Sequence, residues 1–177
     1  RTRLIYQKRD AGRQTQLTLN DFAFTDAEGR AEPEADIFVE HQQQGDAPGV
    51  DDRVAFRASR LDLARLRSLA MHLPIPVKVH DVLDKTQPGG VLEGVKASLH
   101  LQNDEVTDYD AQGSFKGLSG RTTDGASFVR NLTGKADLNQ GRGNLVLNSR
   151  DVVLATPGIL PINEVPLTEL SGKVSWQ

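Results

Sequence analysis

The sequence predicts an α+β, mainly β protein: an antiparallel, bent β-meander or groove with an inserted two-helix hairpin. Three observations support this fold class. Apolar and polar residues alternate over most of the chain, as they do in strands. Turn-forming residues recur between these short stretches, which favours hairpins over βαβ units. Helical spacing of apolar residues occurs in a single interval, residues 59–87, so we expect one β-rich domain over residues 1–177.

The N-terminal part predicts strands over residues 3–7, 16–24, 37–40 and 53–58, with a hairpin turn at 26–29 and a loop over 43–52. Within 16–24, Leu17 and Leu19 share one parity, whereas Phe22 and Phe24 share the other. Because a strand has a period of two, this change at Asn20–Asp21 predicts a bulge or a bend.

Ser59 is the expected N-cap of the first helix, with Asp62 completing a capping box. The apolar stripe of this helix ends at Pro74, which stops it. Pro76 suits the first turn of a second helix, for which we expect Val79, Val82 and Leu83 to form the apolar side.

From Val91 onward the pattern predicts strands almost throughout. A motif of leucine, serine or threonine, glycine and a basic residue occurs at 118–121, 132–135 and 170–173, with a looser copy at 92–94. We interpret its glycine as a bend or bulge where a strand enters the sheet. The alternative is chance, because Leu-Ser-Gly is common in β proteins.

Composition excludes several classes of function. A net charge of −3 argues against a nucleic-acid partner. The absence of cysteine excludes disulfides and thiolate metal sites. No apolar run reaches the length of a membrane span within these residues. The four histidines lack ligand spacing, and residues 117–121 do not match a nucleophile elbow, so we expect no enzyme, no catalytic residue, no metal and no cofactor.

The order of several stretches resembles AsmA-like proteins of the YhdP type. The resemblance rests on the strand and hairpin at 17–24 and 26–30 and on the helix opening at 59–63. It also rests on Leu73-Pro74-Ile75-Pro76 followed by the passage 87–92, and on the closing stretches 115–120, 148–152 and 170–176. Residues 77–80 depart from it, being weaker helix formers than expected.

This resemblance implies a segment of a larger periplasmic protein that is anchored in the bacterial inner membrane. It implies a hydrophobic β-groove that carries phospholipid acyl chains towards the outer membrane and supports envelope integrity. The implied partners are phospholipid or acyl chains and the rest of the same polypeptide. The family has no catalytic residues to carry over.

We expect a lipid groove to be lined by apolar residues of the second half of the chain, namely Leu99, Leu101, Phe115, Phe128, Leu138, Leu145, Leu147, Leu154 and Trp176. Alternation alone does not distinguish an open groove from the closed core of a β-sandwich. The alternative is therefore a structural or protein-interaction β-sandwich that acts as a spacer in the cell envelope. A carbohydrate-binding sandwich is disfavoured, because one tryptophan and two tyrosines offer little surface for sugar stacking.

Overall fold

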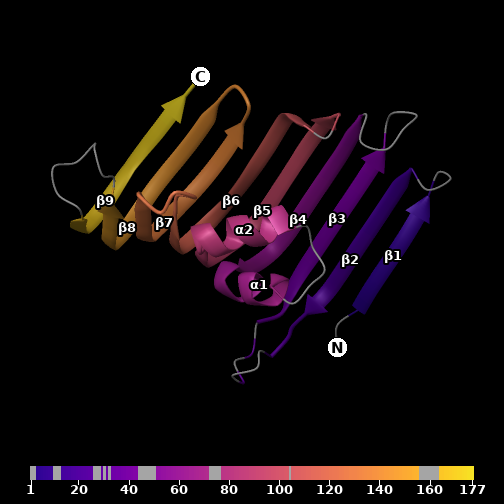
Figure 1. Cartoon of the computed structure of the whole chain (residues 1–177), viewed down its shortest axis with the longest axis horizontal. Helices are drawn as coiled ribbons and strands as arrows, with labels where there is room; N and C mark the ends of the chain where they lie inside the picture. The colour runs from indigo at the N-terminus through magenta and orange to yellow at the C-terminus, as the bar shows by residue number, and fades with distance from the viewer. Residues whose placement is uncertain are drawn as a thin grey trace.

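A computed structural model of the chain shows one antiparallel sheet whose nine strands, β1 to β9, lie side by side in sequence order (Figure 1). It describes residues 3–9, 13–25, 29, 31, 33–43, 51–71, 77–103, 105–155 and 164–177. The predicted fold class is confirmed: a mainly β, antiparallel meander with a two-helix insertion. The expected turn at 26–29 and loop over 43–52 lie largely outside the described residues.

The insertion separates the first four strands from the last five. The strands are β1 (Arg3–Arg9), β2 (Gln14–Phe22), β3 (Ala35–Gln43), β4 (Asp52–Asp62), β5 (Gly89–Gln102), β6 (Glu105–Arg121), β7 (Phe128–Asn139), β8 (Gly143–Ala155) and β9 (Val165–Trp176), and the helices between β4 and β5 are α1 (Leu63–Ala70) and α2 (Val77–Thr86). Both helices of the predicted hairpin are therefore present.

The first helix begins later than its sequence predicts. Its N-cap is Asp62, whose Oδ1 accepts a hydrogen bond from the Arg65 backbone N–H at 3.1 Å. Ser59 still belongs to β4, and its hydroxyl accepts a bond from the Asp36 N–H at 2.9 Å. The prediction of Ser59 as N-cap was wrong, because β4 continues to pair with β5 as far as Asp62.

The two helices lie across one end of the sheet, over β4, β5 and β6 (Figure 1). Leu66 of α1 lines a small cavity with Phe22, Ala35 and Leu61. His80 of α2 lies 3.0 Å from the backbone oxygen of Ala70, which ties the second helix to the first. The hairpin thus covers only part of one face of the sheet.

Left-handed residues interrupt the strand ladders. Their positive φ angles occur at Asp21 (52°), Gly90 (97°), Gly94 (59°), Gly117 (61°), Asn131 (63°) and Asp151 (52°). The pairing register between neighbouring strands shifts close to each of these residues. At Asp151 the shift occurs in the pairing of β8 with β7, whereas the pairing of β8 with β9 stays in register. The bulge predicted at Asn20–Asp21 is confirmed, and similar bulges recur in strands where no parity change indicated them.

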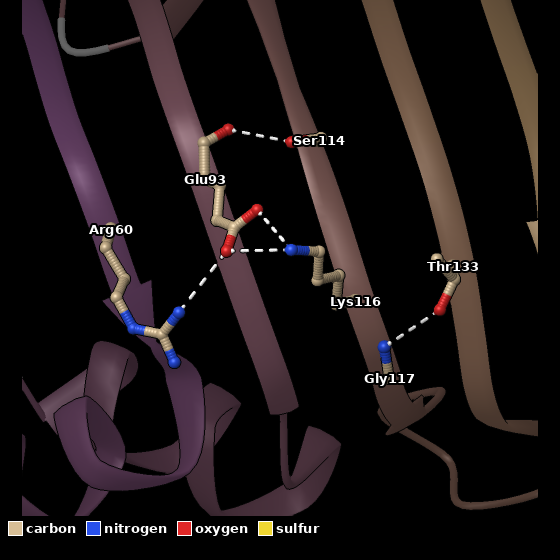
Figure 2. Close-up of polar contacts among 6 residues, drawn as sticks. All are labelled: Arg60, Glu93, Ser114, Lys116, Gly117 and Thr133. Carbon is tan, nitrogen blue, oxygen red and sulfur yellow. Dashed lines mark hydrogen bonds and ion pairs between the residues drawn. The ribbon is translucent and has the colours of Figure 1, made fainter. Parts of the chain in front are cut away.

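The repeated motif supports these bulges through its serine or threonine hydroxyl, whereas the sequence had suggested that its glycine forms them. Only the looser copy places its glycine, Gly94, in the left-handed region at a bulge. The glycines of the other copies lie inside strands without a positive φ, although Gly120 and Gly134 border register shifts. Instead, the Thr133 hydroxyl accepts a hydrogen bond from the Gly117 N–H at 3.2 Å (Figure 2). The Ser119 hydroxyl accepts one from the Asn131 N–H at 3.2 Å. The motif's hydroxyl therefore satisfies backbone groups that a bulge removes from the ladder.

Candidate functional site on the apolar face of the sheet

The register divides the sheet into two chemically different faces, because residues paired across strands share a face and neighbours along a strand alternate. One row of successive partners crosses from β1 to β7 and is apolar throughout: Tyr6, Leu17, Val39, Phe56, Ala97, Ala111 and Leu138. The adjacent row, on the other side, is mostly polar: Thr18, Phe38, Arg57, Lys96, Gln112, Asp137 and Asn144. We call these sides the apolar face and the polar face.

The apolar face remains accessible over much of its extent. Leu99 and Tyr109 in the middle of the sheet are 37% and 39% exposed, and Val174 and Trp176 on β9 are 50% and 48% exposed. Among the described residues, the buried apolar side chains are only Ala35, Ala58, Leu61, Phe115, Val152 and Ala155. No second sheet packs against the described strands, which form a single sheet. The apolar face is therefore not consumed as the core of a closed sandwich.

Most of the residues expected to line a groove lie on the apolar face. Leu99 and Leu101 share the parity of Ala97 on β5, and Phe115 that of Ala111 on β6. Leu145 and Leu147 pair with Ala136 and Gly134, which share the parity of Leu138. Trp176 pairs with Gly143, the partner of Leu138.

Phe128 and Leu154 lie on opposite faces, although both were expected in the same lining. Leu154 pairs with Val129, which pairs with Gly120. A Cβ at Gly120 would lie 3.4 Å from the Thr86 oxygen at the end of α2, so this side is the apolar, helix-bearing face. Phe128 has the opposite parity and lies on the polar face, where the Arg130 guanidinium is 4.9 Å from its ring centroid.

Sequence reasoning missed the contribution of the first strands. Leu4, Tyr6, Leu17, Val39 and Phe56 extend the apolar face over β1 to β4, and Leu4 and Tyr6 are 63% and 60% exposed. The signal was present, because these residues alternate with polar ones just as those of the second half do. The apolar face thus crosses the whole sheet.

The ion pairs of the central strands lie on the polar face. The Glu93 carboxylate bridges two cations: its oxygens lie 2.9 and 3.1 Å from the Lys116 Nζ, and 3.3 Å separates it from the Arg60 Nη1 (Figure 2). The hydrogen bond from Lys116 is the main cause that lowers the pKa of Glu93. These ion pairs connect β4, β5 and β6 on the polar face.

A polar pair marks the end of the apolar face remote from the helices. The His41 Nε2 lies 2.7 Å from the Asp52 Oδ2, and Asp52 is buried beside its partner Leu101. Within the described ranges, no group of three or more His, Cys, Asp or Glu side chains is placed to hold a metal ion. None of the helices that the structure describes has the length and apolarity needed to cross a bilayer.

Comparison with known proteins adds an independent line of evidence. Neither the curated proteins nor the solved structures contain a match to this sequence. The sequence model of one family, described as YhdP protein, matches residues 2–177, which is nearly the whole chain. The amphipathic open sheet and this match agree with the resemblance carried by the strand and Leu-Pro-Ile-Pro motifs. The chain belongs to the YhdP protein family.

Proposed function

We propose that this chain is a non-enzymatic periplasmic domain whose apolar face holds phospholipid acyl chains. In this proposal it forms part of a hydrophobic groove through which phospholipid moves towards the outer membrane, within a protein anchored in the inner membrane. Membership of the YhdP family supports an envelope protein. The observation that carries the proposal is the apolar face itself, which crosses all nine strands and which the described helices contact mainly at β4 to β6.

The physical demands of such a ligand match what this face offers. Burying an acyl chain yields roughly 0.8 kcal/mol per CH₂ group, and no charged clamp is needed for it. Nine strands spaced by about 4.8 Å make a row of about 38 Å, which is of the order of the hydrocarbon thickness of a bilayer. The face is thus long enough for an extended chain to run across the strands.

Lipid retention by the full-length protein tests the proposal. We would extract the protein gently, score bound phospholipid by native mass spectrometry and measure uptake of a fluorescent fatty acid. In the double variant L99D/V174D, two carboxylates are placed at exposed positions of the apolar face, and we expect bound lipid to fall at least tenfold.

The matched control is S98D/S175D, which places the same charges one residue away on the polar face. We expect this variant to retain lipid, because its carboxylates point away from the bound chain. Absence of lipid from the unsubstituted protein, or equal losses in the two double variants, would refute the acyl-chain proposal.

A further inference from the structure

An apolar hollow lies on the polar face. This hollow of about 290 Å³ lies over β2 to β5, and its lining includes Thr18, Asn20, Phe38, Arg57 and Lys96. Phe38 is the aromatic residue of the polar row, and the Arg57 guanidinium lies over its ring at 5.6 Å from the centroid. A bulge at Gly94, which also lines the hollow, interrupts β5 beside Lys96.

Two cations face the hollow without a carboxylate partner in the described part of the chain. Arg57 and Lys96 are direct partners across β4 and β5, and neither takes part in an ion pair with a described acidic residue. Like charges at directly paired positions destabilise a sheet. By contrast, Arg60 and Lys116 on the same face are both neutralised by Glu93. An anion bound between Arg57 and Lys96 would offset their repulsion.

One carboxylate also lines the hollow, but it has a structural role. Asp36 lies two residues before Phe38, and its Oδ1 accepts a hydrogen bond from the Asp21 N–H at 3.1 Å. Its own N–H donates to the Ser59 hydroxyl at 2.9 Å. These bonds connect Asp36 to the bulge at Asp21, whereas no ion pair joins it to Arg57 or Lys96.

The residue types and the volume of the hollow favour a protein as its ligand. Energetically important interface centres are enriched in aromatic residues and arginine within a polar rim. Here Phe38 and the Arg57 guanidinium over its ring line the hollow together, and Thr18, Asn20 and Ser59 are among its other lining residues. The volume lies at the lower limit of small-molecule sites, which are about 300–1,000 Å³, and suits an inserted side chain better.

We propose that the polar face docks an acidic segment of a partner protein at this hollow. An aspartate or glutamate of the segment would accept a bidentate hydrogen bond from the free edge of the Arg57 guanidinium, with Lys96 adding a second positive charge. An apolar side chain next to that carboxylate would enter the hollow against Phe38. The site lies on the side of the sheet opposite the acyl-chain face and does not depend on lipid binding.

Site-specific photo-crosslinking in cells tests this docking site on the full-length protein. A photoreactive residue at position 18 replaces Thr18 inside the hollow. We expect a discrete protein adduct whose yield falls at least tenfold in R57E and in K96E. The control K173E makes the same charge change on the polar face outside the hollow, and its adduct yield should remain unchanged.

The identity of the crosslinked adduct then shows whether the ligand of the hollow is an acidic protein segment. Mass spectrometry should find the crosslink in a peptide that carries an acidic residue next to an apolar one, and changing that acidic residue to lysine should restore the adduct with R57E. No adduct, an adduct of phospholipid mass, or a yield insensitive to R57E and K96E would each overturn the proposal. Thermal unfolding verifies that both variants fold; each replaces a like-charge pair with an opposite one, so their Tm values should not fall.

Discussion

Phe115 lies directly over Gly134, its register partner on the next strand. A Cβ at position 134 would be 2.8 Å from the Phe115 Cζ and 2.3 Å from the backbone oxygen of Val146. The glycine leaves room for the ring, which is 6% exposed and is one of the few well-buried side chains on the apolar face. The glycine of this motif copy therefore allows close packing rather than a bend.

Gly134→Ala should destabilise the protein clearly. The new methyl group meets backbone as well as an aromatic ring, and backbone inside a paired strand cannot move away cheaply. We expect a loss of about 2–4 kcal/mol in the free energy of unfolding, measured by urea denaturation. Combining it with Phe115→Leu should cost less than the sum of the two changes, because the shorter side chain removes one of the two clashes. If G134A left the free energy of unfolding unchanged, the strands around position 134 would have to be packed loosely enough to accept the methyl group.

Gly143→Ala offers a contrast at a similar position. A Cβ there would fall 1.9 Å from the Trp176 Cζ2, but this ring is 48% exposed at the end of an edge strand. The ring can swing into solvent, so we expect a loss below about 1 kcal/mol. Trp176 is the sole tryptophan, and its fluorescence should shift to longer wavelength in the variant. A loss as large as that of G134A would mean that Trp176 is held in place.

Glu93→Gln should remove a pH-dependent part of the stability. The hydrogen bond from Lys116 lowers the folded-state pKa of Glu93, so its contribution is present above the unfolded pKa and is lost as pH falls through the folded value. The stability difference between the unsubstituted protein and E93Q should therefore be constant near neutral pH and shrink below about pH 4.3. Urea denaturation between pH 7 and pH 3 measures it. A difference independent of pH would contradict the role of Lys116, and K116M should remove most of the same pH dependence.

Substitutions of Asp151 measure how much the left-handed backbone of a bulge costs in stability. It is exposed in β8 with a φ of 52°, a conformation that favours glycine and tolerates aspartate better than alanine. We expect Asp151→Gly to raise the free energy of unfolding by about 0.5–1 kcal/mol and Asp151→Ala to lower it by a similar amount. Thermal unfolding of both variants gives the order. Equal stabilities would mean that the bulge relaxes out of the left-handed region.

Several features of the fold could be read directly from local patterns. The alternation around Leu17, Leu99 and Leu145 indicated strands, and the parity change at Asp21 indicated a bulge. The bulges at Asn131 and Asp151 could not be predicted from the parity of apolar residues. They depend on hydrogen bonds from hydroxyl and amide groups of neighbouring strands: the Asn131 Nδ2, for example, donates to the Arg150 oxygen at 2.8 Å. The start of α1 was misplaced because pairing of β4 with β5 outweighs the capping signal at Ser59.

The sequence by itself determined which residues share a side of each strand, since a period of two is a local property of an extended chain. Whether the apolar side was covered was decided only by the tertiary structure, as were the separation of Phe128 from Leu154 and the meeting of Arg57 with Lys96 over Phe38. These outcomes depend on register and on which distant elements pack together. Alternation looks the same in a strand whether its apolar side meets a second sheet or remains exposed.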